Sequence, residues 1–221
     1  MLVIASPRSI IKAMALNVRK IKMFTGIIEA IGEIKQLTQK SNAISLQIEP
    51  GKLEMGDVKV GDSIAVNGVC LTVTSLSNHL FTVDVSEETL HCTFGLDRVG
   101  NDVNLEKAMR LTDRLGGHLV SGHVDGIGEV TKFEQVGENY LLAIKSPPSL
   151  LKYITVKGSI TINGVSLTVN RICDDILAIN LIPHTLAETN LKHLKPGERL
   201  NLESDMLARY VARLMELSSG R

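Results

Sequence analysis

The sequence predicts an all-β protein built from two similar barrels in tandem. Three observations support this fold class: a long internal repeat, short strand-like segments in both copies, and Asn-Gly turns at equivalent places. Residues 67–73 return as residues 163–169 with six of seven residues identical. The repeat is longer than a solenoid or propeller unit, so each copy is expected to be a complete small domain. Two similar domains offer similar pockets to two similar ligands.

The repeat extends along most of both copies. Residues 25–28 align with 121–124, residues 31–34 with 127–130, Thr89-Leu90 with Thr185-Leu186 and, after a slip of one residue, 104–106 with 201–203.

Each copy contains short segments in which apolar residues alternate or run together, many of them β-branched. The predicted strands are residues 44–48, 63–66, 70–74 and 81–85 in the first copy, and 141–144, 159–162, 167–169 and 176–180 in the second. Asn-Gly at 67–68 and 163–164 is typical of a tight hairpin. Many short strands with turn signals predict a closed or nearly closed barrel in each copy.

The sequence predicts little helix. Short helical turns are expected near residues 87–92 and 106–111, with counterparts after Pro183 and near Glu203, the last of which is longer. This terminal helix is expected to have Ser204 as its N-cap, because apolar residues recur at helical spacing: Met206, Leu207, Tyr210, Val211, Leu214 and Leu217. Two alternatives stay open for this apolar stripe, packing on its own barrel and self-association.

Composition favours a small uncharged ligand. The 221 residues carry a net charge of +0, so the basic footprint of a nucleic-acid-binding protein is missing. Aromatic residues are 3% with no Trp, which argues against a base-stacking platform. No stretch is long and apolar enough for a membrane span. The three cysteines, Cys70, Cys92 and Cys173, lack zinc-ligand spacing, so reduced thiols, a cytoplasmic location and no metal are expected.

Residues 1–22 lie outside the repeat and contain five basic residues but no acidic one. They are either a transit-like leader, which would imply an organelle, or an over-long start. The second interpretation is preferred because the first repeat begins at once after Met23.

The sequence shows no phosphate-binding loop, dinucleotide fingerprint or nucleophile elbow. Differences between the copies are therefore the best guide to chemistry: Cys70 is matched by Ser166, Ile27 by His123, Glu88 by His184, and Asp84 by Asn180. Each candidate alone also has an ordinary structural explanation. A strand cysteine is more often an inert buried thiol, Asp205 suits the first turn of a helix, and the repeated Glu106 and Glu203 fit a role in the fold.

At these residues the chain resembles the riboflavin synthase family of duplicated lumazine-binding domains. The motifs that carry the resemblance are residues 23–27, 67–73, 116–123 and 163–169, and it covers residues 23 to about 217. The resemblance implies two six-stranded Greek-key barrels, at residues 23–118 and 119–205, and a helix at 206–221 that holds a homotrimer. Lumazine synthase, the preceding enzyme of the pathway, is a candidate partner.

The activity implied is a dismutation of two 6,7-dimethyl-8-ribityllumazine molecules by transfer of a four-carbon unit, without metal or redox cofactor. The working site would form between the N-terminal barrel of one subunit and the C-terminal barrel of its neighbour. The catalytic candidates are Ser63, Cys70, His123 and Asp205. The first pocket would comprise Gly26, Ile27, Ile28, Cys70, Leu71, Thr72, Asp84, Val85, Ser86, Glu87, Glu88 and Thr89. The second would comprise Gly122, His123, Val124, Lys157, Ser166, Leu167, Thr168, Asn180, Leu181, Ile182, Pro183, His184 and Thr185.

One departure from the family's pattern is His184, where a glutamate is usual. The alternative to an enzyme is a non-catalytic lumazine- or flavin-binding antenna protein of the same fold. Such proteins tend to lose polar groups from one pocket, whereas this chain keeps polar side chains in both. A purely structural double barrel would leave these matched polar groups unexplained.

Overall fold

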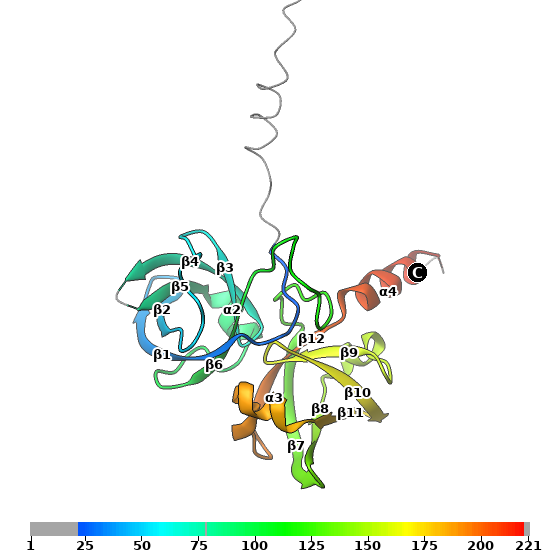
Figure 1. Cartoon of the computed structure of the whole chain (residues 1–221). Coiled ribbons are helices and arrows are strands. Elements are labelled where there is room, and N and C mark those ends of the chain that lie inside the picture. The colour runs from blue at the N-terminus through cyan, green and yellow to red at the C-terminus, as the bar shows by residue number, and fades with distance from the viewer. Residues whose placement is uncertain (1–21, 78, 219–221) are drawn as a thin grey trace, which may run out of the picture.

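Two β-barrels lie side by side, and a single helix projects from the second (Figure 1). The computed structural model describes residues 22–77 and 79–218. The prediction about a leader or over-long start falls, apart from Lys22, outside the described residues.

Both barrels are closed, six-stranded and antiparallel, as predicted. The first closes in the order β1-β2-β5-β4-β3-β6 and the second in the order β10-β11-β8-β7-β12-β9. The strands of the first are β1 (Ala30–Gln39), β2 (Ala43–Glu49), β3 (Ser63–Val66), β4 (Val69–Ser77), β5 (Leu80–Ser86) and β6 (Asp102–Lys107). Those of the second are β7 (Gly126–Val136), β8 (Asn139–Lys145), β9 (Ser159–Ile162), β10 (Val165–Cys173), β11 (Ile176–Leu181) and β12 (Arg199–Ser204).

Short helices connect the strands of each barrel. They are α2 (Glu87–Cys92), α3 (Pro183–Glu188) and two 3₁₀ segments, η1 (Pro148–Tyr153) and η2 (Asn190–His193). The helical turns predicted near residues 87–92 and after Pro183 are therefore confirmed. The turn predicted at residues 106–111 is wrong. Glu106 belongs to β6, and the chain beyond it stays extended because Ala108 N donates to Ser63 O at 3.0 Å and Met109 N to Met23 O at 2.7 Å.

Each barrel encloses its own apolar core, because alternate strand residues point inward. The strand β2 shows the alternation, with Ile44, Leu46 and Ile48 buried between partly exposed residues. A third, small cluster of Phe24, Ala65 and Val120 lies where the segment before β1 pairs with the linker before β7. The two barrels thus have separate cores and are in contact at a seam.

The Asn-Gly turns meet at this seam. Asn67 and Gly68 have φ of 48° and 80°, and Asn163 and Gly164 have 47° and 83°, as the type I′ hairpin requires. A Cβ on Gly68 would lie 2.7 Å from Gly164 N, and one on Gly164 would lie 2.8 Å from Gly68 N. Only glycine lets the two backbones approach this closely.

Two asparagines extend the seam symmetrically. Asn104 Nδ2 of β6 donates to Asn163 O at 3.0 Å, and Asn201 Nδ2 of β12 donates to Asn67 O at 3.0 Å. Both asparagine side chains are buried, so each bond to the other barrel satisfies a donor that would otherwise be costly. Each barrel therefore hydrogen-bonds to the Asn-Gly turn of the other barrel.

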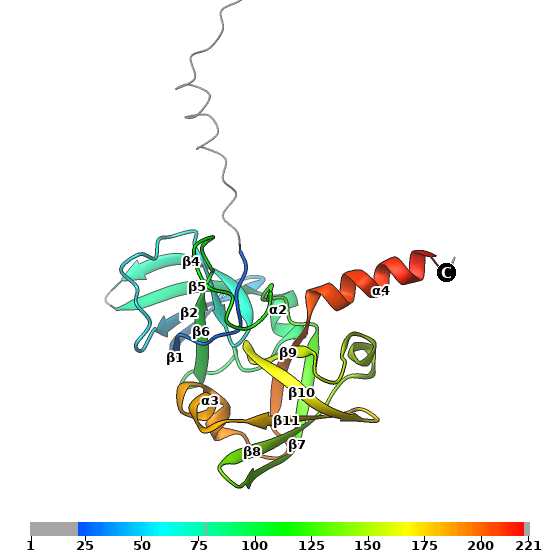
Figure 2. The ribbon, with the colours of Figure 1, turned by 45° about the vertical axis from the view of Figure 1, so that its right-hand side comes forward.

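The terminal helix α4 (Met206–Ser218) has no buried residue and points away from both barrels (Figures 1 and 2). Its apolar stripe is exposed, with Leu214 63% and Tyr210 65% accessible. Packing of the stripe on its own barrel is thus not observed. Ser204 is not its N-cap, because it ends β12 with its amide bound to Asp125 Oδ2, and Asp205 Oδ1 instead accepts from Leu207 N at 2.9 Å.

In the part of the chain that the structure describes, α4 and the other helices are too short or too polar to cross a membrane.

The close approach of the turns predicts that Gly68→Ala is far more destabilising than a matched substitution at Gly100. Gly100 has φ of 87°, but a Cβ there meets nothing within 4 Å. We expect Gly100→Ala to lower the free energy of unfolding by about 1 kcal/mol, from left-handed strain alone. We expect Gly68→Ala to lower it by roughly 3 kcal/mol or more, because the seam must also open. Urea unfolding of both variants measures this, and equal losses would contradict it.

Candidate functional site

Equivalent strands of the two barrels present polar residues on their outer faces. In β4, Leu71 is buried in the core whereas Cys70 is half-buried and Thr72 exposed on the opposite face. In β10, Ser166 is half-buried and Thr168 exposed in the same way. Each barrel therefore carries a hydroxyl or thiol and a threonine on one outer face.

Strand register brings further predicted residues to the first of these faces. Ser63 pairs directly with Thr72 between β3 and β4, so their side chains share a face. Val73 pairs with Val83 at the end of the β4–β5 ladder, so Thr72 and Asp84 are the residues that follow this last pair on the two strands. In the second barrel the β10–β11 ladder ends at the pair of Val169 and Ile179, and Thr168 and Asn180 follow it in the same way.

A pocket of about 370 Å³ opens beside Ser63, lined also by Lys22, Met109 and Leu111. Ser63 Oγ is buried and makes no hydrogen bond of normal geometry to another described residue. Burial raises the pKa of the Cys70 thiol, although the nearby Ser63 hydroxyl and Lys22 oppose part of the rise. The thiol of Cys70 is therefore mainly neutral near pH 7.

The Thr-Gly and Ser-Gly segments before each barrel lie against the other barrel. Gly26 O accepts from Ser166 N at 2.7 Å, and Gly122 O accepts from Cys70 N at 2.8 Å. Ile28 packs against the core of the second barrel, and Val124 against the core of the first. The segment with Gly26 thus adjoins the Ser166 face of the second barrel, and the segment with Gly122 adjoins the Cys70 face of the first.

A buried carboxylate fixes each of these segments. Glu106 accepts hydrogen bonds from Thr25 N, Thr25 Oγ1 and Gly26 N at 2.6, 2.7 and 2.9 Å. Burial raises the pKa of Glu106 to about 7, against the effect of these donors, and the nearby Glu29 charge adds to the rise. Glu203 makes the equivalent bonds, and burial also raises its pKa, with Ser121 and Arg209 opposing. The repeated glutamates therefore have the role in the fold that their recurrence suggested.

His118 is a site residue that sequence reasoning missed. Its Nδ1 lies 2.7 Å from Ser166 Oγ, and its buried Nε2 has no partner among the described residues. Burial lowers the pKa of His118, and the charge of Asp205 opposes this. Gly117 makes room for this contact, because a Cβ there would lie 2.1 Å from Thr25 O and 2.9 Å from Ser166 Oγ. The Gly-Gly pair lets the histidine reach the strand.

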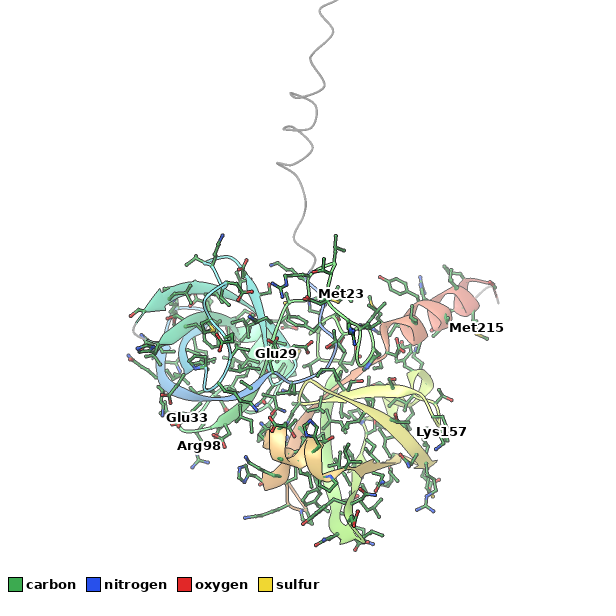
Figure 3. All side chains as sticks on the ribbon, viewed as in Figure 1. Met23, Glu29, Glu33, Arg98, Lys157 and Met215 are labelled. Carbon is green, nitrogen blue, oxygen red and sulfur yellow. The ribbon has the colours of Figure 1, made fainter. Side chains whose placement is uncertain are left out.

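Lys157 holds a left-handed conformation, with φ of 67°, and lies at the outer edge of the second barrel (Figure 3). The equivalent place in the first barrel is Gly61, with φ of 90°, and both amides donate to the matching valine carbonyls. A lysine is strained there by roughly 1–2 kcal/mol. The two copies therefore share this backbone conformation and differ in the side chain that it carries.

Several other predicted residues lie in or against the barrel cores. Leu71, Val85 and Leu181 are buried among their barrels' core residues. Leu167 packs against the second core from a half-buried position. His123 and Ile27 are exposed.

The predicted segments at the ends of β5 and β11 start helices. Asp84 pairs with Lys40 at 2.7 Å, and Ser86 caps α2, whose first residues are Glu87, Glu88 and Thr89. Ile182 precedes α3, which begins with Pro183, His184 and Thr185. Asp205 serves as the cap of α4 and lies near enough to His118 to influence its charge. Residues 22–77 and 79–218 contain no cluster of three or more side chains suited to a metal ion.

Comparison with known proteins agrees with this duplicated architecture. The model of the lumazine binding domain matches the chain twice, at residues 25–108 and 121–205. Riboflavin synthase of Photobacterium leiognathi is 47% identical over 88% of this chain and 90% of its own length. Riboflavin synthase of Bacillus subtilis is 46% identical over 87% of this chain and 90% of its own. The crystal structure of LumP complexed with 6,7-dimethyl-8-(1'-D-ribityl) lumazine superposes with a TM-score of 0.73 at 30% identity, covering 82% of this chain and 98% of that one.

The burial of Glu106 predicts a pH-dependent stability that Glu106→Gln removes. A carboxyl with a raised pKa binds more protons in the folded state, so its stabilising contribution is present below about pH 4.5 and is lost as pH rises through about 7. We expect the free energy of unfolding of the wild type to fall between these pH values by up to about 3 kcal/mol more than that of the variant. Urea unfolding across this range measures the difference, and parallel pH profiles would contradict it. Glu203 is present in both proteins, so its contribution to the pH dependence cancels in the difference between them.

Proposed function

The chain belongs to the lumazine-binding domain family, and we propose that it catalyses the formation of riboflavin from two molecules of 6,7-dimethyl-8-ribityllumazine. One molecule gives a four-carbon unit to the other, which leaves riboflavin and 5-amino-6-ribitylamino-pyrimidinedione. The observation that carries this proposal is the 47% identity to a riboflavin synthase along nearly the whole of both chains. The two matched domains agree with a need for two copies of one ligand.

The duplicated fold suits a reaction between two identical molecules. The substrate supplies its own electrophile in the ring and its own carbon acid at a methyl group, so the protein's main contribution is to hold two rings in contact. Such orientation alone can lower a barrier by roughly 7–11 kcal/mol. The outer faces carrying Cys70 and Ser166 would each hold one ring, with strand apolar groups against its plane.

Unlike residues on the two faces would assign unlike roles to the two molecules. His123 is exposed, and an imidazole has a proton affinity suited to removing a methyl proton near neutrality. Either Ser63 or Cys70 would add to the ring or position the water that does. Ser166, bonded to His118, would face the second ring.

The exposed stripe of α4 supports a homotrimer in which the N-terminal barrel of one subunit faces the C-terminal barrel of the next. Stripe residues pointing to water, as Leu214 and Tyr210 do, are stabilised when they are covered by other copies. A reducing compartment such as the cytoplasm fits the free thiols of Cys70, Cys92 and Cys173. Association with lumazine synthase would deliver the substrate at its source.

A second candidate function is that of a lumazine-binding protein without turnover, which the similarity to LumP favours. The enzyme is preferred on two grounds. Identity to the two synthases compared above is 46–47%, against 30% to LumP. Both outer faces also keep polar side chains, namely Ser63, Cys70, Ser166 and Thr168.

The proposal is tested by incubating the purified full chain with 6,7-dimethyl-8-ribityllumazine and following riboflavin by its absorbance. We expect riboflavin and the pyrimidinedione in equal amounts, because each transfer makes one of each. Tight binding of the lumazine without product would instead support the antenna function.

Lys157→Gly provides a matched arm of this experiment. Because Gly61 already holds this conformation in the first barrel, the substitution should leave urea stability equal or slightly higher. A fall in turnover in this stably folded variant then reports the lost ammonium group, and Gly61→Ala is the control that adds strain without removing a charge. Unchanged turnover would remove Lys157 from the site.

The trimer is tested by Leu214→Asp, which places a charge in the stripe. We expect a folded monomer with little activity, because each working site would need two subunits. Arg213→Ala, on the same turn, is the control and should stay assembled and active. Light scattering with the riboflavin assay measures both properties, and an active trimer of Leu214→Asp would refute the assignment.

A further inference from the structure

Two relays of hydrogen bonds cross the seam in opposite directions. Each begins at a buried glutamate of one barrel, passes through a Thr-Gly or Ser-Gly segment, and ends at the main-chain amide of a polar residue on the other barrel. The residues at the two ends are Glu203 with Cys70, and Glu106 with Ser166.

The first relay starts in the second barrel. Glu203 Oε1 accepts from Ser121 N and Ser121 Oγ at 2.8 and 2.7 Å, and Oε2 accepts from Gly122 N at 3.0 Å. Gly122 O then accepts from Cys70 N of the first barrel at 2.8 Å. A Cβ on Gly122 would lie 2.6 Å from Cys70 Cβ, so this segment sets the position of the cysteine.

The second relay consists of equivalent hydrogen bonds and starts in the first barrel. Glu106 holds Thr25 and Gly26 through three hydrogen bonds, and Gly26 O accepts from Ser166 N at 2.7 Å. A Cβ on Gly26 would lie 2.6 Å from Ser166 Cβ. Each barrel thus fixes the polar residue of the other.

These carboxylates are expensive to bury. Glu106 is 4% and Glu203 1% exposed, and burial without partners would cost several kcal/mol. Fixing a loop to its own barrel could be done with neutral groups. A charged acceptor gives shorter and stronger bonds, which hold a segment at a defined position. Arg209 of α4 lies 3.9 Å from Glu203, so the first relay also connects to the terminal helix.

We propose that Glu203 and Glu106 are positioning residues that act across the seam, Glu203 on Cys70 and Glu106 on Ser166. The functional meaning rests on the proposed function, in which these two faces hold the two lumazines. The crossed dependence itself is a property of the fold and is tested without turnover.

The reporter for the first relay is the thiol of Cys70. In a Cys92→Ser, Cys173→Ser background of the full chain it is the single thiol, and its rate of reaction with dithiobis(nitrobenzoate) is measured against pH. Glu203→Gln loses one acceptor oxygen, so we expect the plateau rate at high pH to rise about tenfold, the effect of one weakened charge-assisted bond. Glu106→Gln is the matched control and should leave the plateau within about twofold.

The pH profile separates positioning from charge. The Glu203 carboxylate raises the pKa of Cys70, so its removal also shifts the midpoint. A shifted midpoint with an unchanged plateau would mean electrostatics alone and would overturn the proposal.

The reciprocal arm uses Ser166→Cys in a background that also carries Cys70→Ser. Here Glu106→Gln should raise the plateau about tenfold and Glu203→Gln should not. Equal effects of both glutamine variants on either reporter would mean a general loosening of the fold and would overturn the proposal.

If urea titration shows that a glutamine variant does not fold, a milder variant replaces it. Ser121→Ala removes one hydrogen bond to Glu203, and Thr25→Val removes one to Glu106. A protein that forms no riboflavin but shows the crossed pattern refutes the proposed function alone.

Discussion

The structure depends on the contact of two backbone turns at the seam. Gly68 and Gly164 approach so closely that neither has room for a side chain. This approach lets Asn104 and Asn201 each reach the turn of the other barrel. Each barrel donates the same hydrogen bond to the turn of the other. The two barrels are therefore equivalent at the seam, as their repeated sequences are. The seam therefore preserves the equivalence of the two copies in its hydrogen bonds.

Shared and unlike residues of the repeat serve different purposes. Shared residues such as Glu106 and Glu203 build the seam, and their hydrogen bonds have the same pattern in both copies. Unlike pairs such as Cys70 and Ser166 occupy the outer faces just beyond it. Two equivalent backbone segments with different side chains can bind two identical molecules and stabilise a different role for each. A dismutation requires this, because one molecule gives the transferred unit and the other receives it.

The sequence predicts eight of the twelve strands of the described residues and misses β1, β6, β7 and β12. In β1 and β7, glycine and charged residues interrupt the apolar alternation. The eight predicted strands are all present. The strands β6 and β12 escape detection because Asn104, Glu106 and their partners in β12 put polar side chains at buried positions. The same conflict explains the wrong helix at residues 106–111. His118 is missed because its contact with Ser166 depends on the linker, which pattern alone cannot place.

Several features of the described residues depart from the local rules of stability. Lys157 is in a left-handed conformation where its counterpart is glycine. Glu106 is a carboxylate buried at a cost, and α4 exposes an apolar stripe. Arg209 pairs with Asp125 at 2.8 Å and lies near Glu203, which joins α4 to the second barrel. Glu203 holds Ser121 and Gly122, and Gly122 O accepts from Cys70 N. Hydrogen bonds and ion pairs therefore connect α4 with the face that carries Cys70. The exposed stripe and the buried Glu203 therefore lie in one connected region with Cys70, which is where a chain under functional constraint is expected to depart from local consistency.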